Sequence, residues 1–179
     1  MATASTRRDR VDSMLAFLAT LEPERDASAK AIAWRLRRAA RKLDTEVRRR
    51  LAPLGMELWE LEILSGLRRA GGTLTVGELL DVAQLTSGAI TNRVGRLERN
   101  GYVRRDVDPD DRRQVLVTLT ASGLERQLQA VEANDVAERE VFAAIDPALQ
   151  QQLAGDLREL LLAIEGPDPT AEAHGSVGA

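Results

Sequence analysis

Polar and basic side chains recur at helical spacing within residues 86–101, TSGAITNRVGRLERNG. Ile90, Val94 and Leu97 follow the i, i+4, i+7 spacing of an apolar helix face, which predicts that this side is buried. Hydroxyl, amide and guanidinium groups elsewhere on the helix can donate to base edges or phosphate oxygens. These groups belong to Ser87, Thr91, Asn92, Arg96 and Arg99. An ordinary amphipathic surface helix has the same pattern, so the neighbouring segments must distinguish the two interpretations.

The segment before this helix supports a DNA-reading role. Residues 75–78, TVGE, have the spacing of a capping box and predict a short helix that ends by about Ala83. Only two or three residues separate it from Thr86, a good N-cap for the next helix, which Asn100 and Gly101 end. Two short helices joined by so tight a turn are typical of a helix-turn-helix.

After Gly101 the sequence becomes typical of strands. Residues 102–107 and 115–119 are rich in β-forming side chains, and residues 108–111, DPDD, are turn formers. Arg112 and Arg113 follow the turn. We therefore predict a hairpin with a basic tip, which is the wing of a winged helix.

Apolar residues at helical spacing predict further helices near residues 7–21, 26–51, 56–69, 121–144 and 147–165. The last two have more apolar surface than one wing could cover, so we expect a homodimer. The predicted fold class is mainly α with a small β wing, a winged helix-turn-helix plus a helical dimerisation lobe. The expected divisions are 1–55 and 121–165 for the lobe, 56–120 for the DNA-binding domain, and 166–179 for a disordered tail.

Composition excludes several kinds of active site. The chain has no cysteine, and its one histidine, His174, lies in the predicted tail. Disulfides, metal clusters of cysteine or histidine, and a Ser/His/Asp triad are therefore excluded. There is no glycine-rich phosphate loop either, so we expect no cofactor, no metal and no enzymatic activity. No apolar run is long enough to span a bilayer, and residues 1–10 lack the order of a signal peptide, so we expect a cytoplasmic protein.

Charge is distributed unevenly along the chain. Residues 1–120 hold 22 basic and 17 acidic side chains, whereas residues 121–179 hold 3 and 11. The two parts therefore carry +5 and −8, although the whole chain carries only −3. A basic front and an acidic back suit a protein that presents one face to a polyanion such as double-stranded DNA.

With these segments in order, the chain resembles the MarR family of winged-helix transcriptional regulators from about Ala31 to Leu162. The motifs that carry the resemblance are LTSGAITNRVGRLERNGYVRR and DPDDRRQVLVTLTASG. The wing is similar to that of members in which an arginine enters the minor groove, held by an acidic residue two positions earlier. The matching residues here are Arg113 and Asp111.

The segments LAPLGMELWELE and LTSGAITNR, with the extra N-terminal helix, look like the branch of urate- and trans-aconitate-responsive repressors. The resemblance implies that a small anionic organic effector lies among Glu60, Arg93 and Arg105. The acid here is Glu rather than the Asp of urate responders, and their N-terminal tryptophan is replaced by Leu18. Loss of an aromatic plate weakens purine stacking but leaves two cations, so we expect a polycarboxylate such as citrate or aconitate.

Alternatives remain at this stage. Glu60 is either a solvated group or half of an internal ion pair, and Arg93 and Arg105 could instead contact phosphate or pair with Glu60. If Glu60 faces two buried arginines, about one positive charge stays uncompensated unless an anion binds. The candidate functions are a ligand-responsive repressor, a DNA-binding regulator without an effector, and a regulator that responds to urate or another purine. An enzyme is the least favoured candidate.

Overall fold

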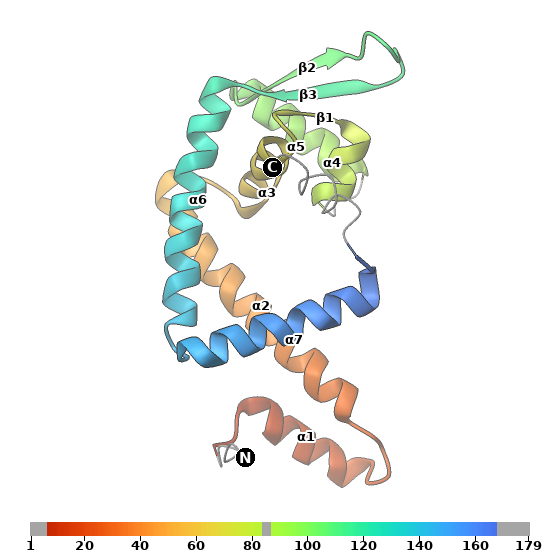
Figure 1. Cartoon of the computed structure of the whole chain (residues 1–179), viewed down its shortest axis with the longest axis vertical. Coiled ribbons are helices and arrows are strands. Elements are labelled where there is room, and N and C mark those ends of the chain that lie inside the picture. The colour runs from red at the N-terminus through yellow and green to blue at the C-terminus, as the bar shows by residue number, and fades with distance from the viewer. Residues whose placement is uncertain (1–6, 84–86, 168–179) are drawn as a thin grey trace, which may run out of the picture. The chain divides into compact units, whose positions relative to one another are not determined.

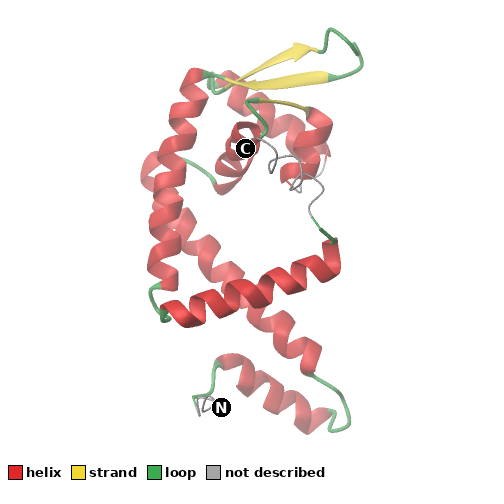
Figure 2. Ribbon diagram, in the orientation of Figure 1, coloured by secondary structure: helices red, strands yellow, loops and turns green. Residues whose placement is uncertain are grey.

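The computed structural model describes residues 7–83 and 87–167, and these are mostly helical with one small sheet (Figures 1 and 2). Thr86, the predicted N-cap, and all of the predicted tail beyond residue 167 lie outside the described residues. The chain divides into two compact units, Met1–Glu138 and Arg139–Ala179, which we describe separately.

The first unit begins with α1 (Arg10–Leu21) and α2 (Ser28–Leu51). Asp9 caps α1, because its carboxylate accepts the Asp12 backbone N–H at 2.8 Å while the Asp12 carboxylate accepts the Asp9 N–H. Arg35 of α2 donates to Asp9 at 2.9 Å and to Asp12 at 2.6 Å. These ion pairs hold the N-terminal helix against α2.

A helix and turn connect α2 to the core. The 3₁₀ helix η1 (Ala52–Leu54) ends at Gly55, whose φ of 60° is the left-handed conformation that glycine adopts without strain. The following helix, α3 (Leu58–Arg69), buries most of its side chains at the centre of the unit. Its Ile63, Leu64 and Leu67 are fully buried.

The predicted helix-turn-helix is confirmed as α4 (Val76–Ala83) and α5 (Ser87–Arg99). In the capping box, the Glu78 carboxylate accepts the Thr75 N–H at 2.7 Å, and the Thr75 hydroxyl accepts the Glu78 N–H at 3.2 Å. The three residues of the predicted apolar face, Ile90, Val94 and Leu97, are all buried. The helix ends as expected, with Gly101 at a φ of 75°.

The wing is the hairpin of β2 (Val103–Val107) and β3 (Val115–Leu119), whose tip extends beyond the helices in Figure 1. The sequence prediction missed a third strand, β1 (Thr73–Thr75), which pairs antiparallel with β3 and gives the order β1-β3-β2. A three-residue strand has no periodicity of its own. It exists because residues more than forty positions later supply its hydrogen-bonding partners.

The long helix α6 (Ala121–Phe142) begins as predicted, with the Thr120 hydroxyl accepting the Gly123 N–H at 3.0 Å. Gln127, also in α6, donates to Ser65 at 3.2 Å and accepts from Arg68 at 2.8 Å. These contacts fix the first half of α6 to α3.

The second unit contains the last turn of α6 and the helix α7 (Pro147–Glu165). Asp146 caps α7 by accepting the Leu149 N–H at 2.9 Å, and Pro147 occupies the first turn, as predicted. Within α7, large apolar side chains remain exposed: Leu149, Leu153, Leu160, Leu161, Leu162 and Ile164. None of the helices described is long and apolar enough to cross a membrane.

Candidate nucleic-acid interface

The face of α5 opposite its buried stripe carries exposed polar side chains. Thr91, Asn92 and Arg99 are exposed, and they are among the residues that the sequence predicts to contact DNA. Ser87 lies in the first turn of α5, but its side chain is outside the described set. The burial of α5 is therefore consistent with a helix that offers one face to a partner.

Arg96 is also exposed, and its guanidinium contacts two carboxylates, those of Glu57, just before α3, and Glu60, within α3. That group lies 2.6 Å from a carboxylate oxygen of Glu57 and 5.3 Å from the centre of the Trp59 ring. The hydrogen bonds from Trp59 and Arg96 keep the pKa of Glu57 below its ordinary value. The predicted base reader thus points back to the neighbouring helix in this structure.

Glu60 is part of an internal ion pair and is not a solvated surface group, the other possibility that the sequence left open. It is only 1% exposed, and its oxygens lie 3.5 Å from Arg96 Nη2 and 3.6 Å from Arg126 Nη2. Burial raises the pKa of Glu60, and the two arginines oppose that rise only in part. The carboxylate therefore joins α3 to both α5 and α6.

Arg93 and Arg105 have other partners. The Arg93 guanidinium lies 5.4 Å from the Trp59 ring centre, within the range of a cation–π contact. Arg105, on β2, donates from Nε to Glu98 at 2.8 Å, and this hydrogen bond keeps the pKa of Glu98 low. Among the described residues, no ion pair joins Glu60 to Arg93 or to Arg105.

The structure therefore does not bring the predicted effector set together as the sequence led us to expect. Glu60 instead faces Arg96 and Arg126, while Arg93 lies over the Trp59 ring, where its charge acts on Glu57 and Glu62. The physical reason for the difference is the rotamer: a helical wheel gives the side of α5 on which Arg93 lies, but tertiary packing decides where its long side chain goes.

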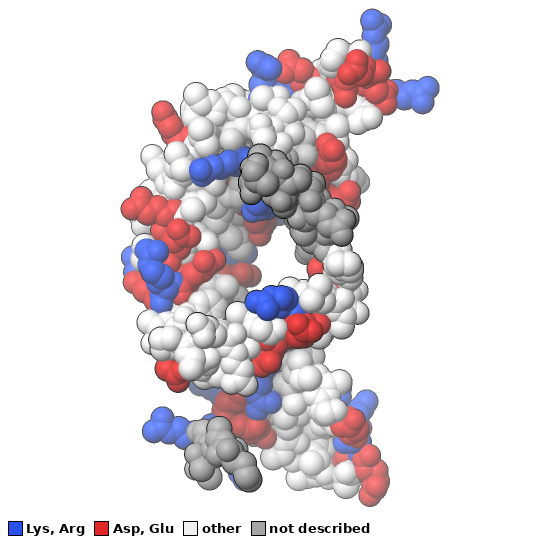
Figure 3. All heavy atoms as spheres, in the orientation of Figure 1, with Lys and Arg blue, Asp and Glu red and all other residues white. Residues whose placement is uncertain are grey.

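At the wing tip, Asp111 orders the turn. One of its carboxylate oxygens accepts the Arg113 backbone N–H at 3.0 Å and the other accepts the Gln114 side chain at 3.1 Å. The first of these bonds lowers the pKa of Asp111. The side chains of Arg112 and Arg113 are exposed, and Figure 3 shows basic groups projecting at the hairpin tip.

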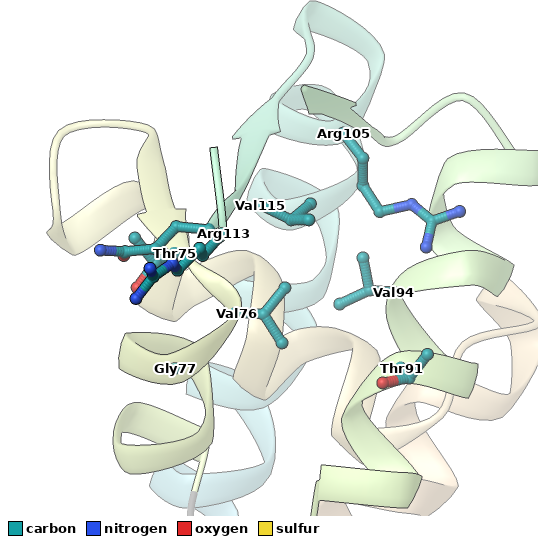
Figure 4. Close-up of a pocket in the computed structure, with 9 residues that line it drawn as sticks. Thr75, Val76, Gly77, Thr91, Val94, Arg105, Arg113 and Val115 are labelled. Atoms are coloured by element: carbon teal, nitrogen blue, oxygen red, sulfur yellow. The ribbon is translucent and has the colours of Figure 1, made fainter. Parts of the chain in front are cut away.

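A pocket of about 390 Å³ lies between the wing and the helix-turn-helix. Figure 4 shows Val76, Val94 and Val115 between Arg105 and Arg113, whose side chains extend away from the valines on opposite sides. Arg105 is thus the one member of the predicted effector set that lines this pocket. An anion placed there would contact both the wing and the recognition helix.

Sequence reasoning missed Glu57 and Arg126 as members of the charged cluster. Glu57 precedes the first turn of α3, and Arg126 lies on α6, 66 positions after Glu60. Arg126 is one of only three basic residues after position 120, which was the available signal. Its pairing could not be predicted, because it depends on how α6 packs.

Comparison with known proteins identifies the fold and its relatives. Residues 54–114 match the MarR family. A relative is the uncharacterized HTH-type transcriptional regulator YcgE of Bacillus subtilis, 46% identical over 70 residues, which cover 38% of this chain and 45% of that protein. The matches thus span about half the length of the first curated relatives.

Two solved structures of similar fold contain DNA. Sco3205, a MarR family regulator from Streptomyces coelicolor in complex with DNA, is 27% identical with a TM-score of 0.68, over 79% of this chain and 91% of that one. A mutant of Escherichia coli MarR complexed with operator DNA is 25% identical with a TM-score of 0.68, over 75% of this chain and 96% of that one. The fold is therefore that of a winged helix-turn-helix regulator. The comparisons do not confirm the urate- and aconitate-responsive branch.

Proposed function

We propose that this chain is a MarR family transcriptional regulator and binds double-stranded DNA through the winged helix of residues 54–114, the segment that matches that family. The observation that carries the proposal is that the exposed polar face of α5 follows α4 in a helix-turn-helix and adjoins a hairpin whose tip exposes Arg112 and Arg113. Thr91 and Asn92, with Ser87, read base edges in the major groove, and Arg99 contacts the backbone. A repressor of this kind acts in the cytoplasm.

The wing supplies the second contact. Asp111 holds the backbone of the tip, so Arg112 and Arg113 extend from a turn of fixed shape. In the proposed complex Arg113 enters the minor groove, where the negative potential attracts a guanidinium. Arg112 contacts phosphate.

The active form is a homodimer on a pseudo-palindromic site. Exposed apolar side chains near both ends of the chain support this: Phe17 and Leu21 of α1, and the exposed leucines of α7. In water such surfaces gain free energy when a second copy covers them. The predicted lobe, residues 1–55 and 121–165, is therefore proposed as the dimer contact.

A small anionic organic effector, such as citrate or aconitate, is proposed to release the DNA. The pocket between wing and recognition helix supports it, because Arg113 and Arg105, the second of which also pairs with Glu98, line a space of about 390 Å³. Leu18 in place of a tryptophan still disfavours urate.

A regulator without an effector is the second candidate. The ion pairs of Glu60 favour it, since Glu60 faces Arg96 and Arg126 and no ion pair among the described residues joins it to Arg93 or Arg105, the set that was expected to bind an anion.

Selection of duplexes from a randomised DNA pool tests the proposed function. We expect recovery of an inverted repeat that the protein binds at nanomolar affinity at physiological salt, far more tightly than unrelated duplex. Binding that stays equally weak for every duplex would contradict the proposal. A thermal-shift screen of organic acids then separates the two candidates, because a specific ligand must raise the melting temperature.

A further inference from the structure

Glu60 sits where three helices meet. Its carboxylate contacts Arg96 of α5 at 3.5 Å and Arg126 of α6 at 3.6 Å, and it is only 1% exposed. The helix that carries it, α3, lies at the centre of the core. Any rotation of α5 against α6 would therefore separate this buried carboxylate from one of its two cations.

The α6 side of this contact is fixed. Arg126 donates to the Leu54 carbonyl at 2.8 Å and to the Gly55 carbonyl at 3.0 Å, and its guanidinium lies 5.4 Å from the Tyr102 ring centre. One polar atom on each partner, Arg126 Nε and Glu60 Oε2, is buried without a hydrogen bond. The pair is therefore held in place by its surroundings rather than by full hydrogen bonding.

The α5 side is fixed as well. Arg96 is bound by Glu57 at 2.6 Å and packs over Trp59. To reach a base edge, the Arg96 guanidinium, which is 46% exposed, would have to give up its contacts with two carboxylates and an aromatic ring.

We propose that Glu60 is a positioning residue for DNA reading: through Arg96 and Arg126 it locks the recognition helix to α6. Arg96 acts through this lock and does not contact a base. This proposal rests on the proposed function. It replaces the sequence-based expectation for Arg96 and gives the buried carboxylate a purpose other than stability.

The titration of Glu60 supports a role outside stability. Burial raises its pKa, so the ionised carboxylate costs free energy in the folded state. The contribution of Glu60 to stability therefore becomes less favourable as pH rises through the interval between its ordinary and its raised pKa. The charged groups that face it are Arg126, Arg96 and Glu57.

The test measures the affinity of the dimer for its selected duplex. We expect Glu60→Gln and Arg96→Ala each to weaken binding by about tenfold, and the double variant to be no weaker than either single variant, because both remove the same lock. The matched control is Glu62→Gln on the same helix. Burial raises the pKa of Glu62 too, but its charge acts on Arg93 and no ion pair among the described residues joins it to Arg96 or Arg126, so the effects of Glu62→Gln and Arg96→Ala on affinity should simply add.

Two further readouts separate positioning from simple structural damage. Glu60→Gln should change the melting temperature little, because the lower cost of burying a neutral amide and the loss of the counter-charge to Arg126 act in opposite directions. The ratio of parent to Glu60→Gln affinity should be largest near pH 8 and approach one as pH falls through the raised pKa of Glu60.

Specificity distinguishes the two roles of Arg96. On duplexes with single base-pair changes, Arg96→Ala should reduce discrimination at all positions together. Loss of preference at one position alone would make Arg96 a base reader and overturn the proposal. Parent-like affinity of Glu60→Gln, or a loss explained by a lower melting temperature, would overturn it too. A parent protein that selects no duplex would instead overturn the proposed function, and this proposal with it.

Discussion

Arg113 is the side chain through which we expect the wing to reach DNA. Arg113→Ala should weaken operator binding by about tenfold or more and reduce the slope of log affinity against log salt by about one, because one cation leaves the complex. The matched control is Arg104→Ala, on the same sheet, where the arginine already pairs with Asp106. Fluorescence anisotropy titrations at several salt concentrations measure both. Equal losses for the two variants would mean that only the total charge of the wing matters.

Residue types in the candidate site could be predicted, but their partners could not. The exposed and buried sides of α5 follow from a 3.6-residue period, so Asn92 and Ile90 are on the expected faces. Arginine has a long side chain with many rotamers, and its partner is decided by which elements pack nearby. That is why Arg105 pairs with Glu98 and Arg96 with Glu57, neither of which the sequence indicated.

Helix α6 packs so closely against the residue before β2 that there is no space for a side chain at Gly123. A Cβ added at Gly123 would lie 1.9 Å from the Tyr102 carbonyl oxygen, and backbone cannot move aside cheaply. Gly123→Ala should therefore destabilise the protein by about 2 kcal/mol or more, which lowers the melting temperature by roughly 4–8 °C. Thermal unfolding followed by circular dichroism measures the change.

The control for this substitution is Gly95→Ala in α5. There an added Cβ meets only the flexible end of Arg99, at 4.0 Å. Alanine is the better helix former, so stability should rise by roughly 0.5–1 kcal/mol. If both variants were destabilised equally, the close approach at Gly123 would not be the cause.

Helices that begin with a capping residue could be predicted from the sequence, whereas strand β1, which has no local sequence signal, could not. Capping residues such as Thr75, Thr120 and Asp146 act within three residues of the helix they begin, so sequence alone located α4, α6 and α7. Strand β1 has no such signal, because only its pairing with β3 makes it a strand. The joint between α3 and α6 was missed for the same reason: Gln127 and Ser65 are 62 positions apart.

The exposed apolar side chains of α1 and α7 predict that the protein assembles as a homodimer. Multi-angle light scattering at micromolar concentration should give twice the mass of the 19.6 kDa chain. Half-sites of the selected duplex should then lie about one helical turn, roughly 10 base pairs, apart. Ile164→Glu, which places a charge on the most exposed apolar position of α7, should shift the protein toward monomer. A parent protein that is already monomeric would contradict the dimer.

We also expect a small anionic effector to control DNA binding. The pocket joins Arg105 and Arg113 of the wing to Thr91 and Val94 of the recognition helix, so an anion that fills it changes how wing and helix sit together. Those two elements must fit the duplex simultaneously. Citrate or aconitate at sub-millimolar to millimolar concentration should therefore weaken operator binding. The coupling expected is about 1–3 kcal/mol, and it is reciprocal, so operator DNA should weaken ligand binding by the same factor.

The measurement is a titration of operator affinity against ligand at fixed ionic strength, with sulfate as the matched anion, because any multivalent ion screens DNA binding. Arg105→Ala should blunt the response, since this arginine lines the pocket. Arg93→Ala should also blunt it if the anion reaches the Trp59 face, where Arg93 lies 5.4 Å from the ring centre. A response lost with Arg93 but kept without Arg105 would move the effector from the pocket to that face. Equal release of DNA by sulfate, or an unchanged response in both variants, would contradict control by a small anion. The protein would then be a regulator without an effector, in which the ion pairs of Glu60 serve to hold the recognition helix.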